Sequence, residues 1–177
     1  MISALAGCAL LTGCLGFGGP LVDDGEQDAE SGTDETDGEQ RCGPSTAVVE
    51  YVIDGDTVVL SSGEHVRYLL IDTPETAEGK DECWGPEATE HNAAMVANRA
   101  VSLTYDVECE DQYGRLLAYV AVDDLEINRE LLESGNACVL HIPPNGNGKA
   151  AEYQALEDAA KQAKVGMWGA CGTVYCD

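Results

Sequence analysis

Basic residues are scarce in this sequence of 177 residues. It has 9 Lys and Arg residues against 33 Asp and Glu residues, which gives a formal net charge of −24. Proteins that bind nucleic acid non-specifically do so through a broad basic face, because Lys and Arg neutralise the phosphates. The composition argues against such a face. The acidic surface keeps a protein soluble and fits a salt-rich habitat without proving one.

The sequence also lacks the ligand spacings of a zinc site. It has eight cysteines but no Cys-x-x-Cys pair, and its three histidines, His65, His91 and His141, share no metal-binding spacing. Apart from Cys8 and Cys14, the cysteines are even in number and predict three disulfides in an oxidising compartment. Six cysteines allow 15 pairings and their spacing selects none of these. Small buried thiols are the alternative. The six are Cys42, Cys83, Cys109, Cys138, Cys171 and Cys176.

No apolar run is long enough to span a bilayer with confidence, since a spanning helix needs about 20 apolar residues. Residues 1–19 are apolar, small and free of charge, which predicts an export signal. "LAGC", ending at Cys8, and "LTGC", ending at Cys14, both resemble the lipobox of bacterial lipoproteins. The resemblance implies a signal segment at residues 1–14 and a lipid anchor on Cys14 (or Cys8). The alternative is a frayed apolar N-terminus.

Residues 23–40 hold nine acidic residues and no basic one. Such a segment cannot bury enough apolar surface to offset its ordering entropy, so residues 15–41 are predicted to form a disordered acidic tether. Residues 42–177 are long enough for one domain with a core of its own. That domain holds 24 acidic and 8 basic residues, for a formal charge of −16.

The pattern of apolar residues in this domain predicts three strands, a helix, two strands, a short helix, a short strand and a last helix. This order is that of an α+β protein built on a five-stranded OB-fold β-barrel with three helices. The predicted strands are 45–53, 56–62, 64–71, 101–108, 114–122 and the short 136–142, and the predicted helices are 86–100, 125–135 and 149–164.

Three polar clusters interrupt the ends of these strands: "DGD" (Asp54–Asp56), "RYLLIDTPE" (Arg67–Glu75) and "DQYGR" (Asp111–Arg115). If the third strand runs on to Ile71, its alternation places Arg67 and Asp72 on opposite faces. An arginine in an otherwise apolar strand is costly unless it meets an anion or a wet cavity. Taken singly, each cluster also fits a plain turn or a surface ion pair.

Four motifs in register carry a family resemblance: "VIDGDTV", "RYLLIDTPET", "WGPEA" and "DQYGRLLAYV". In this order and spacing they resemble the thermonuclease family, also called staphylococcal nuclease-like, over residues 46–168. The resemblance implies the same OB barrel, together with calcium-dependent cleavage of the phosphodiester bonds of DNA and RNA.

Metal ligands carry over from this resemblance residue by residue. Asp56 and Asp72 match carboxylates that bind Ca²⁺, and Thr73 matches a ligand through its backbone carbonyl. The chemistry agrees, because calcium takes six to eight hard oxygen ligands, and two close aspartates repel unless a cation lies between them. Asp54 is expected only to brace this loop, behind the ligands.

The catalytic residues carry over in the same way. Glu75 matches the acid that sets up the attacking water, and Arg67 and Arg115 match two arginines on the scissile phosphate. Arginine suits that task because its planar fork stays protonated and donates two hydrogen bonds at once. Tyr113 matches a tyrosine near the bound nucleotide.

Two places depart from the family pattern. Gln112 stands where the family often has a lysine that holds a nucleotide phosphate. In "HIPPNG", His141 and Pro143 are expected at the positions of tyrosines that face the nucleotide. Since base stacking contributes about 1–3 kcal/mol per base, substrate binding is expected to be weaker or differently tuned.

The sequence thus predicts an exported, monomeric, calcium-dependent nuclease that hydrolyses DNA and RNA, preferably single-stranded, by metal-assisted attack of water. One alternative is a non-catalytic OB-fold module that binds nucleic acid or protein, and another is an acidic calcium-binding surface protein. The preference between DNA and RNA, and between internal and terminal cleavage, stays open.

Overall fold

The computed structural model describes residues 42–76, 79, 82–174 and 176. The predicted signal at residues 1–14, with Cys8 and Cys14, and the predicted tether at residues 15–41 lie outside the described residues. Within the described part of the chain, no helix has the length and apolar character needed to cross a bilayer.

Five strands close into a barrel, which confirms the predicted OB fold. Neighbouring strands pair antiparallel in the order β3-β2-β1-β5-β6, and β3 closes the barrel by pairing parallel with β6. Valine-rich sequence favours these strands because branched side chains pack well on a pleated surface. The barrel strands are β1 (Thr46–Val52), β2 (Thr57–Leu60), β3 (His65–Tyr68), β5 (Ala100–Glu110) and β6 (Leu116–Val122).

Three short strands complete the sheets. The strand β7 (Leu125–Glu126) extends the barrel sheet beyond β6. The other two, β4 (Ile71–Asp72) and β8 (Cys138–Val139), pair antiparallel with each other as a separate two-stranded sheet.

The predicted third strand, 64–71, is wrong as a continuous element. It ends at Tyr68, because Leu70 has a φ of 64°, and the chain then enters β4. Left-handed backbone is unusual for leucine. Here Leu70 packs against Gly146, where an added Cβ would lie 2.3 Å from the Leu70 side chain, and its carbonyl accepts a hydrogen bond from Leu140 N. The break turns Asp72 back toward β3.

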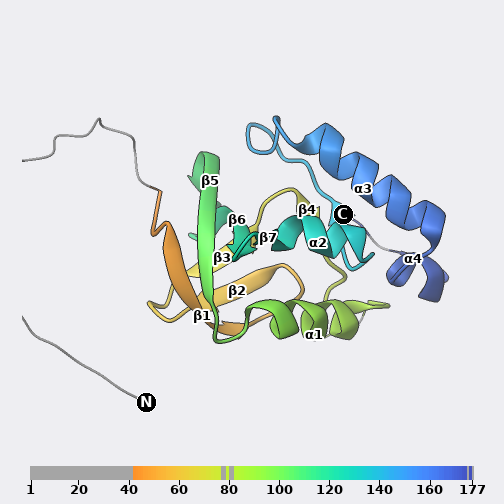
Figure 1. Ribbon diagram of the computed structural model, residues 1–177, viewed down its shortest axis with the longest axis horizontal. Helices are drawn as coiled ribbons and strands as arrows, with labels where there is room; N and C mark the ends of the chain where they lie inside the picture. Colours follow the sequence, from red (N-terminus) through yellow and green to blue (C-terminus); the bar gives the residue numbers. More distant parts are fainter. Residues whose placement is uncertain (1–41, 77–78, 80–81, 175, 177) are drawn as a thin grey trace, which may run out of the picture. The chain divides into compact units, whose positions relative to one another are not determined.

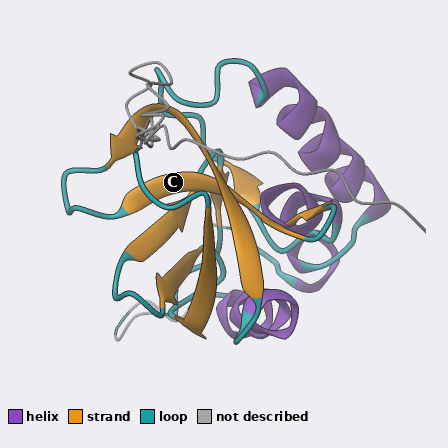
Figure 2. Cartoon of the chain, turned by 60° about the vertical axis from the view of Figure 1, so that its left-hand side comes forward, coloured by secondary structure: helices purple, strands orange, loops and turns teal. Residues whose placement is uncertain are grey.

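All three predicted helices form, together with one more short helix. They lie on one side of the strands (Figures 1 and 2). Pro86 stands in the first turn of α1, where its missing N–H costs nothing. The helices are α1 (Gly85–Val96), α2 (Ile127–Glu133), α3 (Ala150–Ala163) and the additional α4 (Met167–Ala170).

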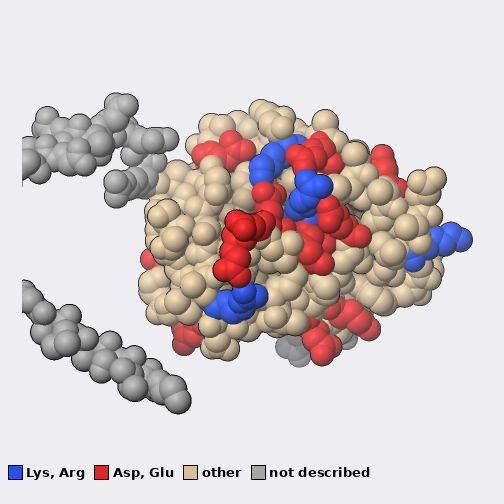
Figure 3. All heavy atoms as spheres, viewed as in Figure 1, with Lys and Arg blue, Asp and Glu red and all other residues tan. Residues whose placement is uncertain are grey.

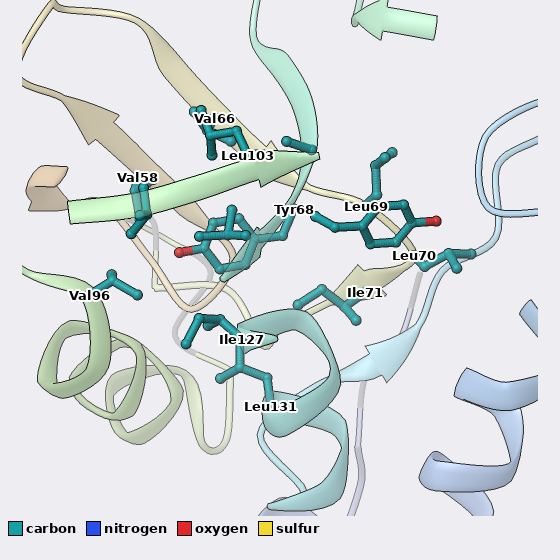
Figure 4. Close-up of a cluster of buried hydrophobic side chains, with 14 of the residues drawn as sticks. Val58, Val66, Tyr68, Leu69, Leu70, Ile71, Val96, Leu103, Ile127 and Leu131 are labelled. Atoms are coloured by element: carbon teal, nitrogen blue, oxygen red, sulfur yellow. The ribbon is translucent and has the colours of Figure 1, made fainter. Parts of the chain in front are cut away.

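A single apolar core joins the barrel to the helices (Figure 4). Val58, Val66 and Tyr68 contribute from the barrel, and Ile127 and Leu131 contribute from α2. Each is at most 1% exposed, so each stabilises the fold by about 1.5–3 kcal/mol of apolar burial. The core holds β2 and β3 rigidly where their ends carry the polar clusters.

The six cysteines of the domain form three disulfides, as predicted, and the structure selects one of the possible pairings. Cys42 pairs with Cys109, Cys83 with Cys171, and Cys138 with Cys176. The chain segments they join are 67, 88 and 38 residues apart. The bonds therefore connect distant segments, where a cross-link most restricts the unfolded chain.

Candidate active site

The "DGD" cluster forms the tight turn from β1 to β2. Asp54 Oδ1 accepts a hydrogen bond from the backbone N–H of Asp56 at 3.1 Å, which shapes the turn. Gly55 lies against Thr73, and an added Cβ would come within 2.6 Å of its Oγ1 atom. Glycine at this position therefore lets the turn approach the segment that follows β4.

Asp56 is the buried centre of the site, with 5% of its surface exposed. Its Oδ2 accepts hydrogen bonds from Thr73 N at 2.9 Å and from Thr73 Oγ1 at 3.2 Å. Its Oδ1 accepts one from Thr57 Oγ1 at 3.1 Å and lies 3.1 Å from Arg67 Nε. A buried carboxylate is stable only with such partners. Thr57, which follows the aspartate directly in "IDGDTV", was not among the predicted site residues.

Arg67 brings the two predicted metal-binding aspartates together. Its Nη2 lies 2.9 Å from Asp72 Oδ1, while its Nε faces Asp56. Its Nη1 donates to the carbonyls of Tyr68 at 2.8 Å and Ile71 at 2.7 Å. The expectation that Arg67 needs an anion is thus met. The expectation that Arg67 and Asp72 lie on opposite faces is wrong, because the strand breaks between them.

Arg115 belongs to the turn that joins β5 to β6. Its Nε lies 2.6 Å from Asp111 Oδ2, and Asp111 Oδ1 accepts the backbone N–H groups of Tyr113 and Arg115. Burial acts to raise the pKa of Asp111, but the hydrogen bonds from Arg115 and Tyr113 outweigh it and hold that pKa below its usual value. The turn therefore fixes Arg115 with an ionised carboxylate.

A cavity of about 40 Å³ collects seven of the eight predicted site residues. Thr57 and Pro74 complete its lining. Asp54 and Asp56 come from the first turn, Arg67 from β3, Asp72 from β4, Thr73 and Glu75 from the segment that follows, and Arg115 from the β5–β6 turn. Its lining residues are Asp54, Asp56, Thr57, Arg67, Asp72, Thr73, Pro74, Glu75 and Arg115.

The eighth predicted residue, Tyr113, lies in a neighbouring groove of about 410 Å³ that shares Arg67 and Arg115 with the cavity. The tyrosine is 76% exposed, and the Arg115 guanidinium lies 5.6 Å from the centre of its ring. The walls are apolar, with Leu69, Leu70, Ile71, Leu117, Leu140 and Ile142, and the polar lining includes Glu108, Glu110, Asp111 and Gln112.

His141 and Pro143, which stand where the family has tyrosines that face the nucleotide, are not among the residues that line this groove. Leu140 and Ile142 line it instead, while His141 is exposed and bonds to Asn147. Both Leu140 and Ile142 lie in the irregular segment that follows β8, which ends at Val139.

Four carboxylates against two arginines around one cavity make the site electronegative. Burial, and then the nearby charge of Asp56, raise the pKa of Asp54 from 3.8 to about 6. Hard oxygen atoms from aspartates and backbone carbonyls are the donors that Ca²⁺ and Mg²⁺ prefer. The side chains of Asp56 and Asp72 with the backbone of Thr73 therefore fit a divalent cation, whose charge would also relieve the repulsion at Asp54.

Ion pairs also mark the rest of the surface. Figure 3 shows basic side chains lying beside acidic ones on one face. Away from the cavity, Arg99, Arg129, Lys149 and Lys161 each have a carboxylate within 3.1 Å. Among the described residues, most basic side chains thus already pair with a carboxylate, and few are left to bind a phosphate.

Comparison with known proteins decides the family. The sequence profile described as "Staphylococcal nuclease homologue" matches residues 65–170. The chain belongs to the staphylococcal nuclease family. It is 35% identical over 132 residues to "Endonuclease YncB" of Bacillus subtilis (strain 168), a match that covers 71% of this chain and 63% of that protein.

Two further relatives agree with this assignment. "Thermonuclease" of Staphylococcus intermedius is 35% identical over 126 residues, covering 68% of this chain and 74% of that protein. "SPbeta prophage-derived endonuclease YokF" of Bacillus subtilis (strain 168) is 33% identical over 132 residues, covering 71% of this chain and 45% of that protein. The chain thus spans between about half and two thirds of the length of the two Bacillus relatives.

Proposed function

We propose that this protein is a calcium-dependent nuclease that hydrolyses phosphodiester bonds of DNA and RNA outside the cytoplasm. The single observation that carries the proposal is the cavity in which Asp56, Asp72, Glu75, Arg67 and Arg115 meet. Five residues from four separate segments would not converge there for stability alone, because buried charges cost more than apolar packing. The names of two relatives, endonuclease and thermonuclease, support the same activity.

The two arginines bind and polarise the scissile phosphate. Hydrolysis at phosphorus needs charge stabilisation on the non-bridging oxygens more than it needs a covalent intermediate. Arg115 lines the cavity from the β5–β6 turn and Arg67 lines it from β3, and both also border the larger groove. When a phosphate enters, their guanidinium groups exchange part of their carboxylate contacts for its oxygens.

Glu75 receives the proton of the attacking water. Glu75 lines the cavity together with Arg67 and Arg115. A water held in the cavity would therefore lie between the Glu75 carboxylate and a phosphate bound by the arginines. A carboxylate can act as a general base when it lies within hydrogen-bond reach of the proton that it removes. The leaving oxygen then takes a proton from solvent or from a neighbouring donor, which completes the cleavage.

Asp56, Asp72 and the Thr73 carbonyl would hold the metal. A bound Ca²⁺ supplies Lewis acidity and neutralises charge on the phosphate. Both groups of Thr73 hold Asp56 Oδ2, so the carboxylate is already oriented in the cavity. Asp54 shapes the turn that carries Asp56 and does not itself need to touch the ion.

The groove beside the cavity favours a single strand as substrate. Its apolar walls and the exposed ring of Tyr113 suit an unpaired base, which can stack on an aromatic side chain. A base inside a duplex would not present its face to the groove. The protein would thus accept DNA and RNA as single strands.

Three disulfides support action outside the cytoplasm, because such bonds persist in oxidising compartments. The lipobox-like "LTGC" at Cys14, or "LAGC" at Cys8, would anchor the protein to a membrane through lipid. The acidic residues 23–40 would then separate the enzyme from that membrane. The protein would act as a monomer, since the site is built from one chain.

Hydrolysis of a fluorescent single-stranded oligonucleotide tests the proposal, with Glu75→Gln as the site variant and Glu87→Gln as its control. Glu87 is an exposed glutamate on α1 outside the cavity. Calcium-dependent cleavage that Glu75→Gln abolishes and Glu87→Gln retains is the expected result. Tight binding of the oligonucleotide in calcium without cleavage would instead indicate a non-catalytic binding module.

A further inference from the structure

Glu75 is held through its backbone by a second glutamate. Its N–H donates to the Glu82 carboxylate (Oε2) at 2.9 Å, and the N–H of Glu82 donates back to the Glu75 carbonyl at 3.1 Å. The two residues are seven positions apart, so this reciprocal pair ties two separate parts of the chain to each other. Each residue thereby fixes the backbone of the other.

The residues after Glu82 are tied to the helical side of the molecule. Cys83 forms a disulfide with Cys171, directly after α4. Trp84 donates from Nε1 to Oδ1 of the buried Asn136 at 2.8 Å, and its backbone is left-handed with a φ of 80°. Left-handed tryptophan persists only where its surroundings hold it.

Gly85 packs directly against the backbone of Glu75. A Cβ at this position would lie 2.7 Å from the Glu75 carbonyl oxygen, so only glycine allows the first residue of α1 to pack there. Each of the four consecutive residues 82–85 thus makes a contact of its own. Glu82 and Gly85 contact the Glu75 backbone, and Cys83 and Trp84 bind Cys171 and Asn136. We call the Glu82 carboxylate, the Cys83–Cys171 disulfide and the Trp84–Asn136 hydrogen bond the clasp.

We propose that Glu82 is a positioning residue for Glu75, and that the Cys83–Cys171 disulfide anchors Glu82 in place. The inference rests on the proposed function, since it assigns the clasp to the orientation of the catalytic base. A catalytic group needs its geometry held to a fraction of an ångström, and a shift of 1 Å can cost about 100-fold in rate.

The surroundings of the clasp distinguish this role from general stabilisation. Glu82 is half-buried and Cys83 is exposed, so neither residue belongs to the apolar core. Two hydrogen bonds of Glu82 go to the backbone of Glu75, which lines the cavity, and the next residue, Cys83, is tied to Cys171. Loosening the clasp should therefore change turnover more than substrate affinity.

Two substitutions at Glu82 separate positioning from bulk stability. Glu82→Ala removes the acceptor of the Glu75 N–H and should lower kcat by about 10- to 100-fold, with KM for a single-stranded oligonucleotide changed less than about threefold. Glu82→Gln keeps an oxygen acceptor and should retain kcat within about threefold. A wild-type kcat in Glu82→Ala, or an equal loss in Glu82→Gln, would overturn the proposal.

The disulfide is tested against a matched partner in the same chain. Cys83→Ser/Cys171→Ser and Cys42→Ser/Cys109→Ser open bonds across 88 and 67 residues, so both should lower Tm by similar amounts. Only the first pair should lower kcat, measured well below either Tm. Equal losses of kcat in the two double variants would show that the clasp has no special role.

Amide hydrogen exchange at Glu75 separates the clasp from the proposed activity, because it needs no catalysis. In Glu82→Ala the Glu75 N–H should exchange at least about tenfold faster than in wild type. In Glu82→Gln the same N–H should exchange at close to the wild-type rate. Unchanged exchange in Glu82→Ala would refute the clasp whatever the activity. If exchange responds as expected but wild type cleaves no oligonucleotide, the proposed function fails and the clasp stands.

Discussion

The guanidinium of Arg67 lies 2.9 Å from Asp72, and at the same time it meets Asp56 at 3.1 Å. One cation thus neutralises both aspartates that are proposed to bind the metal. The Arg67 side chain is 13% exposed, and those of Asp56 and Asp72 are 6% and 18% exposed. The cluster is therefore largely shielded from solvent, and each charge in it depends on the others.

Removing this arginine should destabilise the metal-free protein. Arg67→Ala leaves two shielded carboxylates without their shared cation, and breaking a buried pair costs about 3–5 kcal/mol in the free energy of unfolding. Calcium should recover much of this loss, because the ion neutralises the same carboxylates. Urea unfolding in a chelator and in excess calcium measures both values.

The control for that variant is Arg99→Ala. Its partner Asp123 is 88% exposed and Arg99 itself is 49% exposed, so the pair should contribute less than about 1 kcal/mol. The reasoning would be contradicted if Arg67→Ala unfolded at the same urea concentration as Arg99→Ala in the chelator, or if calcium gave Arg67→Ala no extra stability.

Arg115 should be needed for turnover and not for folding. Its side chain is 32% exposed and pairs with Asp111 in a surface turn. Arg115→Ala should lower kcat about 100- to 1,000-fold through the loss of charge stabilisation at the phosphate, with Tm changed by no more than a few degrees. Steady-state kinetics and thermal unfolding on the same sample check this. A variant that keeps more than a tenth of wild-type kcat would remove Arg115 from the proposed chemistry.

Asp54 gives a pH-dependent prediction. Its pKa in the folded protein, about 6, lies above its usual 3.8, so folding disfavours the ionised form. The resulting loss of stability is absent well below pH 3.8, grows as pH rises from 3.8 to 6 and is complete above 6. In a chelator, Asp54→Asn should therefore raise Tm relative to wild type by about 2–5 °C more at pH 8 than at pH 4.5.

Thermal unfolding of wild type and Asp54→Asn at the two pH values gives the comparison. Any contribution of the substitution that does not depend on ionisation cancels in the difference. A change in Tm that is equal at pH 4.5 and pH 8 would mean that Asp54 titrates in the folded protein as it does in the unfolded chain.

The acidic charge should give an unusual salt dependence. With a net charge of −24, the chain repels a polyanion at long range, and salt screens that repulsion. Raising NaCl from about 10 to 150 mM shortens the screening length from about 30 to 8 Å, and KM for a single-stranded oligonucleotide should fall about two- to fivefold. A dinucleotide with one phosphodiester should respond less. A KM that rises throughout this range would show that local cation contacts dominate binding.

Much of the fold follows from patterns that are local in sequence. Branched residues around Val58 and Val120 predict strands because burial on a pleated surface selects them. The proline and acidic residue at the start of α1 predict its beginning. The site residues were found by a resemblance, and the cavity brings together all of them except Tyr113, which lies in the adjoining groove.

What the sequence did not predict depends on contacts between distant residues. Leu70 has a left-handed backbone and packs against Gly146, and a leucine in the sequence gives no sign of this conformation. The same holds for the cysteine pairing and for the place of Leu140 and Ile142 in the groove wall, because both follow from contacts between distant segments. Glu82 stands in a polar loop without a local signal, and only its hydrogen bonds to Glu75 reveal it.

The most direct test of the account is the rate at which the full, oxidised protein cleaves single-stranded DNA in calcium, in magnesium and in a calcium chelator. The account predicts cleavage in calcium, its loss in the chelator, and at least a 100-fold loss of kcat in Glu75→Gln under the same conditions. Equal rates with and without calcium, or no cleavage by a folded sample in any of these solutions, would contradict it.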